Sequence, residues 1–126
     1  MKIIILSPII LLVAIINSCA AQPLRLNSTE FENKIGTEQT ILIDIRTPQE
    51  FSGGHLKNAL NVNFYSPSFM EEISTLGKNK NVLIYCASGN RSGQALQKLK
   101  SNSFKSLADL EGGISSWAAA GKNIVK

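Results

Sequence analysis

The sequence is poor in the residues that build crosslinked or metal-bound folds. Its 126 residues include two cysteines, Cys19 and Cys86, and one histidine. There is no CxxC pair, and the histidine lies at no familiar zinc-ligand spacing from either thiol. We therefore expect no intrachain disulfide framework, no metal and no cofactor.

The sequence also lacks runs of charge, internal repeats and low-complexity tracts. Lysine and arginine number 13 against 9 acidic residues, which gives a net charge of +4. Without a basic run or interleaved aromatic residues, this small excess argues against nucleic acid as a partner and leaves small anions as candidates. The length allows one domain with a real core.

One long apolar run stands at the N-terminus. The fourteen residues Ile3 to Ile16 are apolar except for Ser7 and Pro8, and they follow a basic start. The run is too short to span a bilayer, which takes about 20 apolar residues, but it has the length of a signal-peptide core. We expect residues 1–18 to be a signal peptide and the protein to be exported.

The end of this leader resembles a bacterial lipobox, in which Cys19 becomes the lipidated first residue of the mature protein. Asn17 departs from the small apolar residue usual at its place. The pattern predicts a lipid-anchored protein of the bacterial cell envelope, on the periplasmic side or the outer membrane. The alternative is ordinary signal cleavage, which releases a soluble periplasmic protein. Residues 19–26 contain Pro23 and no periodicity, so we predict a mobile tether there.

The remaining chain, 27–126, alternates strand and helix patterns. The runs Ile41–Ile45 and Val82–Tyr85 are continuously apolar, which favours strands covered on both faces of a parallel sheet. Helices are predicted to begin near Asn27 or Ser28, Pro48, Ser66 or Pro67, Ser92 and Gly112-Gly113, with further strands around Leu60 and Val62 and over Phe104–Leu110. This alternation predicts an α/β fold, a three-layer sandwich with a central parallel sheet and helices on both faces.

The stretch Asn81 to Gly93 carries the best candidate site. Its strand delivers Cys86 to the carboxyl end, where ligands bind in open α/β sheets. The loop residues between Cys86 and Arg91 are small or turn-forming, namely Ala87, Ser88, Gly89 and Asn90. Inward N–H groups, the helix start and Arg91 would all favour an anion. We expect Cys86 to ionise readily and act as a nucleophile; the alternative is a buried structural thiol.

Three stretches of the sequence resemble single-domain rhodaneses, a family of thiosulfate-type sulfurtransferases. They are Ile43–Pro48 with Glu50-Phe51, Gly54-His55-Leu56, Ala59 and Asn61; Val82–Arg91; and Leu110–Ile114 with Trp117. The resemblance implies that Cys86 takes the outer sulfur of a small anion such as thiosulfate and holds it as a persulfide. Cyanide or a cellular thiol would then accept that sulfur. It also implies that N–H groups from Ala87 to Arg91 stabilise the persulfide, while Arg91 holds the loop or the donor.

Three further residues are assigned supporting or binding roles. Asp44 and Arg46 lie near the carboxyl end of a strand, where we expect a buried ion pair that could include Glu50. Ser92 either donates to the loop or caps the following helix.

Two other functions remain open. One is a rhodanese-like sulfur carrier or protein-binding module without turnover, although the sequence indicates no particular protein partner. The other is a Cys-loop phosphatase, whose loop between cysteine and arginine is one residue longer. The shorter loop here favours a sulfur atom over a phosphate group.

Overall fold

The computed structural model describes residues 1–5 and 22–126. The predicted signal peptide falls mostly outside these residues, and Cys19 does so entirely, so both stay predictions. Among the residues that the structure describes, no helix is both long and apolar enough to cross a membrane.

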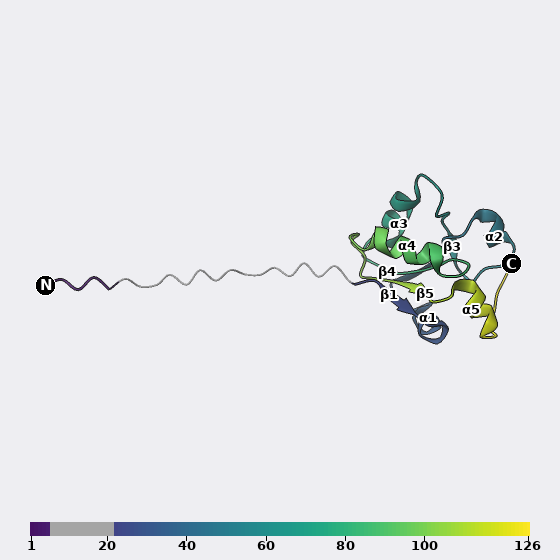
Figure 1. Ribbon diagram of the computed structural model, residues 1–126, viewed down its shortest axis with the longest axis horizontal. Coiled ribbons are helices and arrows are strands. Elements are labelled where there is room, and N and C mark those ends of the chain that lie inside the picture. Colours follow the sequence, from purple (N-terminus) through teal and green to yellow (C-terminus); the bar gives the residue numbers. More distant parts are fainter. Residues whose placement is uncertain (6–21) are drawn as a thin grey trace.

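Within the described residues, five strands and five helices alternate along the chain (Figure 1). The strands are β1 (Leu24–Leu26), β2 (Thr40–Asp44), β3 (Leu60–Asn61), β4 (Asn81–Tyr85) and β5 (Ser106–Leu110). The helices are α1 (Ser28–Lys34), α2 (Pro48–Ser52), α3 (Phe69–Gly77), α4 (Asn90–Leu99) and α5 (Gly113–Ala119). All strand pairs are parallel, in the order β1-β5-β4-β2-β3. The predicted α/β fold with a central parallel sheet is confirmed.

Helices cover both faces of this sheet. In Figure 1, α3 and α4 lie on one side of it, and α1 and α5 lie on the other. Successive residues of β4 point to opposite faces, so Ile84 joins the core under α3 and α4, whereas Leu83 and Tyr85 join the core under α1 and α5. Both faces are therefore dry, as the continuous apolar run Val82–Tyr85 predicted.

Side-chain caps define the starts of α1 and α2. Asn27 forms a capping box with Glu30 at α1, and Thr47 caps α2 with Pro48 in the first turn. α4 begins earlier than predicted, because Gly89 is its N-cap in the left-handed conformation (φ 95°). Ser92 thus lies within the first turn, and the alternative that it caps this helix is wrong.

The predicted tether is wrong for its last three residues. Leu24–Leu26 form β1, which pairs with β5 at one edge of the sheet, and Leu26 is buried. Three residues are too few to show a strand period, and this strand is stabilised by pairing with a partner far away in sequence. The pairing places Arg25 opposite Asp109.

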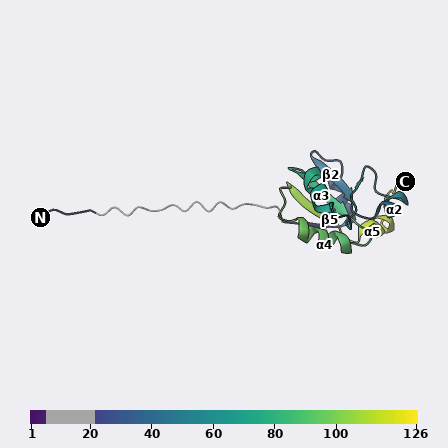
Figure 2. The ribbon, with the colours of Figure 1, turned by 90° about the horizontal axis from the view of Figure 1, so that it is seen from above.

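The carboxyl edge of the sheet is where the connections to α2 and α5 lie. Figure 2, turned by 90° from Figure 1, again shows α2 and α5 beyond the same end of the strands. The C-terminal tail joins them there, since His55 and Val125 exchange backbone hydrogen bonds of 2.8 and 2.9 Å. Cys86 leaves β4 at this edge.

A buried tyrosine ties this edge to the connection between α2 and β3. The Tyr85 hydroxyl accepts a hydrogen bond of 3.0 Å from the buried N–H of Leu56. Burial, reinforced by the nearby Asp44 carboxylate, raises the pKa of Tyr85, so the phenol stays neutral at working pH.

We expect Tyr85→Phe to lower the free energy of unfolding by about 1–3 kcal/mol, because the Leu56 N–H loses its partner inside the core. Urea unfolding measures this loss. Tyr65→Phe, at an exposed position, is the matched control and should change stability by no more than about 0.5 kcal/mol. Equal stability of the two variants would show that the buried hydrogen bond contributes nothing.

Candidate active site

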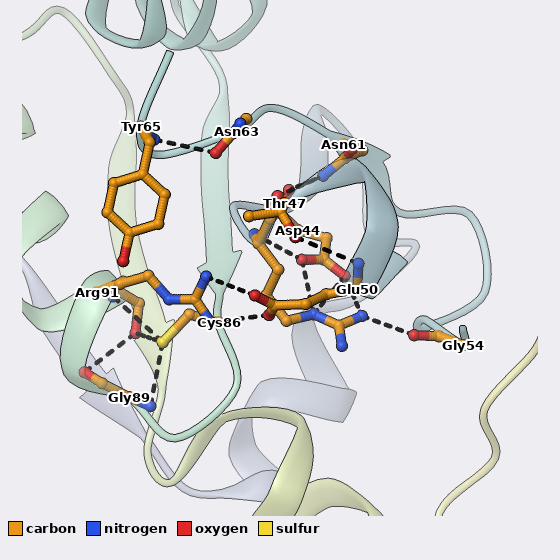
Figure 3. Close-up of polar contacts among 12 residues, drawn as sticks. Asp44, Thr47, Glu50, Gly54, Asn61, Asn63, Tyr65, Cys86, Gly89 and Arg91 are labelled. Atoms are coloured by element: carbon orange, nitrogen blue, oxygen red, sulfur yellow. Dashed lines mark hydrogen bonds and ion pairs between the residues drawn. The ribbon is translucent and has the colours of Figure 1, made fainter. Parts of the chain in front are cut away.

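Cys86 lies under the start of α4 and is 1% exposed. Its Sγ accepts hydrogen bonds from two backbone N–H groups, Gly89 at 3.1 Å and Ser92 at 3.3 Å (Figure 3). The positive φ of Gly89 lets the loop curl back toward the sulfur. Two converging donors at the N-terminus of a ten-residue helix favour a negative charge on Sγ.

These donors to the thiol sulfur overlap only at Gly89 with the N–H groups from Ala87 to Arg91, which were predicted to stabilise a persulfide. Ser88 and Asn90 are exposed on the outer side of the loop, whereas Ser92 is buried. The Ser92 N–H is one of the first-turn groups that have no partner within the helix, so it is free to point at the sulfur. The sequence located the loop, but not which N–H groups face Sγ.

α5 holds the loop from the opposite side. Its Ile114 N–H donates to the Cys86 carbonyl at 3.0 Å, and the Ser115 N–H donates to the Ala87 carbonyl at 3.1 Å. This approach requires glycine at position 113, since a Cβ there would lie 2.5 Å from both carbonyl oxygens. The Gly112-Gly113 pair therefore lets α5 fix two loop carbonyls.

The Ser92 side chain links the sulfur to a buried carboxylate. Its Oγ lies 3.5 Å from Cys86 Sγ and 2.7 Å from Oδ2 of Asp109, a fully buried residue of β5. Arg25 of β1 donates to both Asp109 oxygens, at 3.1 and 2.7 Å. These hydrogen bonds raise the pKa of Arg25.

Sequence reasoning missed Arg25 and Asp109. Asp109 does carry a signal, because it interrupts an apolar strand near its carboxyl end, as Asp44 does in β2. Arg25 carries none, since its strand was not recognised.

Arg91 is held by Glu50 on α2. The two side chains form a double hydrogen bond, Nη1 to Oε1 at 3.1 Å and Nη2 to Oε2 at 2.8 Å. The hydrogen bonds raise the pKa of Arg91 and lower that of Glu50. Figure 3 shows this pair beside Cys86, with the Tyr65 ring near the guanidinium, 5.9 Å from ring centre to Cζ. Glu50 thus pairs with Arg91 and makes no contact with Arg46 among the described ion pairs.

Asp44 and Arg46 form the predicted buried ion pair, at 2.7 Å between Oδ2 and Nη2. Arg46 also donates to the Gly54 carbonyl at 2.6 Å. Burial lowers the pKa of Arg46, but the hydrogen bonds and charge of Asp44 outweigh it and the net shift is upward. The pair fastens the end of α2 to β2, and α2 carries Glu50 to the site.

The Glu50–Arg91 ion pair should make the free energy of unfolding depend on pH. Folding lowers the pKa of the Glu50 carboxyl below its ordinary value of 4.5. Such a carboxylate stabilises the folded protein at pH values above its ordinary pKa, and this contribution is lost as the pH falls through the pKa of the folded state. At pH 7 we expect Glu50→Gln to be less stable than the natural protein by up to about 1 kcal/mol, because the pair is partly exposed.

The stability gap should close toward about pH 3, as the carboxyl becomes protonated. Urea unfolding at the two pH values measures it. Glu38→Gln, at an exposed carboxyl outside the ion pairs of the described residues, should show no gap at either pH. A gap for Glu50→Gln that is the same at both pH values would contradict the ionic contribution.

The part of the chain that the structure describes holds no cluster of three or more histidine, cysteine or acidic residues suited to a metal ion. The chemistry that the site offers is that of a buried thiol sulfur with two N–H donors and a nearby arginine.

Several known proteins are similar to this chain. The rhodanese-like domain matches residues 27–120. A sulfurtransferase of Allochromatium vinosum is 41% identical over 90 residues, covering 71% of this chain and 81% of that protein. Thiosulfate sulfurtransferase 16, chloroplastic, of Arabidopsis thaliana is 37% identical over 89 residues, covering 63% and 74%. An uncharacterized Synechocystis protein, slr1261, is 38% identical over 91 residues; the match covers 71% of this chain but only 49% of that protein.

Solved structures agree with these relatives. A rhodanese-related protein from Thermoplasma volcanium superposes with a TM-score of 0.70 at 28% identity, covering 81% of this chain and 97% of that one. The family match spans most of the chain and includes the Cys86 loop. The chain therefore belongs to the rhodanese-like domain family, which includes sulfurtransferases.

Proposed function

We propose that this protein transfers sulfane sulfur through a persulfide on Cys86. The observation that carries the proposal is the convergence of the Gly89 and Ser92 N–H groups on Sγ, at 3.1 and 3.3 Å. These donors favour an anionic Sγ, which is the nucleophile of the first step and the leaving group of the second. The names of the two sulfurtransferase relatives support the same chemistry.

In the first step, the Cys86 thiolate attacks the outer sulfur of thiosulfate. A new S–S bond forms on Cys86 while the S–S bond of thiosulfate breaks, and sulfite leaves with the electron pair. Because Cys86 is 1% exposed, the donor must present a single protruding sulfur atom. Thiosulfate and small persulfides meet that condition.

In the second step, an acceptor attacks the outer sulfur of the persulfide. Cyanide yields thiocyanate, and a thiolate yields its own persulfide; in both cases the Cys86 thiolate leaves with the bonding electrons and is regenerated. The Arg91 side chain is mostly buried beside the thiol, where its charge stabilises the anionic sulfur, although Glu50 already occupies its hydrogen-bonding edge.

Intact-mass analysis of the purified protein tests the proposal. Thiosulfate should add one sulfur, about 32 Da, on Cys86, and cyanide should remove it as thiocyanate in a sustained turnover. A stable sulfur adduct with negligible thiocyanate would identify a sulfur carrier instead of a turnover enzyme. An unmodified Cys86 after exposure to both thiosulfate and a low-molecular-weight persulfide would overturn the proposal.

We further propose that the protein works in the cell envelope, anchored by lipid on Cys19 or released there after ordinary cleavage. The basic start, the apolar run and the lipobox-like ending support export. Mass spectrometry of the mature N-terminus tests this: a diacylated Cys19 identifies the anchored form, and an intact leader on a cytosolic protein would refute export.

A further inference from the structure

Arg25 contacts both the buried acid and the loop of the site, although it lies outside the matched family segment 27–120. Its guanidinium donates to both oxygens of Asp109, and its Nη2 donates to the Gly89 carbonyl at 2.6 Å. The side chain is 44% exposed, yet it makes three hydrogen bonds to groups that surround Cys86. Arg25 therefore connects the edge strand β1 to the loop that holds the sulfur.

The start of α4 is shaped to accept this guanidinium. A Cβ on Gly93 would lie 2.9 Å from Arg25 Nη2, and a Cβ on Gly89 would lie 3.4 Å from it. Glycine within a helix costs about 1 kcal/mol relative to alanine. The close approach of Arg25 gives a physical reason for glycine at position 93. This steric observation is independent of the hydrogen bonds of Arg25.

Ser92 has one hydroxyl proton and three acceptors within reach of its Oγ. Asp109 Oδ2 is the nearest at 2.7 Å, whereas the Gly89 carbonyl lies at 3.4 Å and Cys86 Sγ at 3.5 Å. With the proton on the Asp109 side, the serine oxygen can accept from a neutral thiol. When the sulfur is anionic, the hydroxyl stabilises it by turning its proton toward Sγ. Asp109 then loses the serine proton and needs other hydrogen-bond donors. Arg25 supplies two such donors.

The Gly89 contact acts on the backbone of the same loop. Because a trans peptide is planar, its N–H points opposite to its carbonyl. Holding the Gly89 carbonyl against Arg25 fixes the next N–H, that of Asn90, to point away from β1. Gly89 also donates its own N–H to Sγ, so the clamp restrains a residue that contacts the sulfur directly.

We propose that Arg25 is a positioning residue for the Cys86 loop. Arg25 neutralises Asp109 and holds the Gly89 carbonyl, so that Ser92 and the loop N–H groups can donate to an anionic sulfur. This inference deepens the proposed function, since it concerns the same thiol. The charged groups around Cys86 are Arg25 on β1, Asp109 on β5, Arg91 on α4 and, through Arg91, Glu50 on α2.

The pH profile of Cys86 alkylation by iodoacetamide, located by peptide mass, tests the inference. In Arg25→Gln, the Asp109 carboxylate loses both guanidinium donors, so we expect the profile to move to higher pH and the rate at pH 7 to fall by up to about tenfold. Arg25→Lys keeps the charge but not the forked geometry, so it should show a smaller shift. Lys122→Gln, which breaks the Lys122–Glu32 ion pair away from the site, is the matched control and should leave the profile unmoved.

A double variant separates positioning from plain stability. If Arg25 acts through Asp109, then Arg25→Gln combined with Asp109→Asn should return the alkylation profile toward that of the natural protein, because no uncompensated carboxylate remains. A profile for Arg25→Gln that matches Lys122→Gln, or that Asp109→Asn fails to restore, would overturn the inference. Urea unfolding of each variant, followed by circular dichroism, measures its stability. A purely structural role would lower the stability while the alkylation profile stays in place.

Alkylation requires no sulfur donor, so the two proposals fail separately. Absence of a persulfide in the natural protein, together with a shifted profile in Arg25→Gln, would overturn sulfur transfer and leave the positioning role standing. Persulfide formation with an unmoved profile would do the reverse.

Discussion

Replacing Cys86 with serine is expected to abolish thiocyanate production from thiosulfate and cyanide, a loss of at least about a thousandfold. Serine fits the space of the thiol and can accept the same two N–H groups, so the loop should keep its shape. Its hydroxyl is not ionised near neutral pH and cannot form a persulfide. The expected loss is thus a loss of chemistry, measured by the thiocyanate assay and by the absence of a sulfur adduct.

Cys19→Ser is the matched control, because it removes the other thiol of the chain. The purified variant should keep the transfer rate of the natural protein even if its lipid processing is altered. An undiminished rate in Cys86→Ser would remove Cys86 from the mechanism. Loss of activity in both variants would indicate that the chemistry needs two thiols.

The second large effect is expected at Gly113. Alanine there must adopt a φ of +60° and must place its Cβ 2.5 Å from the carbonyl oxygens of Cys86 and Ala87. α5 and the loop can relieve this overlap only by moving apart, which breaks the hydrogen bonds from Ile114 and Ser115. We expect Gly113→Ala to lose about 2–4 kcal/mol of stability and most of its sulfur-transfer activity.

Gly121→Ala separates backbone strain from steric overlap. Gly121 has a similar φ of +74°, but a Cβ there would meet nothing within 4 Å. Its alanine variant should lose only about 1 kcal/mol, the cost of a left-handed residue, and keep its activity. Urea unfolding and kcat/KM of both variants make the comparison. Equal losses at the two positions would show that the close approach of α5 does not matter.

Local patterns were enough to predict most of the fold. The runs Ile41–Ile45 and Val82–Tyr85 predicted strands with two dry faces, since no polar face interrupts them. Thr47-Pro48 predicted a helix start because capping is a property of neighbouring residues. β1 was missed because its three residues are held by β5, more than 80 positions away in the sequence.

The same distinction between neighbouring and distant residues applies to the candidate site. Cys86, its loop and the following helix are adjacent in sequence, so their juxtaposition could be predicted. The contact of Glu50 with Arg91 spans 41 positions, and that of Arg25 with Asp109 spans 84. Such pairs depend on the order of the strands in the sheet, and a single sequence does not show which strands and helices lie side by side. Ser92 was recognised as a polar residue near the loop, but its link to Asp109 required the position of β5.

In the proposed lipid-anchored form, the early start of β1 would limit how far the domain stands from the bilayer. Leu24 already belongs to the sheet, so five peptide units separate it from Cys19. An extended chain gains about 3.5 Å per residue, which gives a maximum reach of about 18 Å. On a lipid-anchored form, the β1 edge would lie close to the headgroups, and large partners would have to approach Cys86 from other sides. Small diffusible sulfur compounds would meet no such restriction.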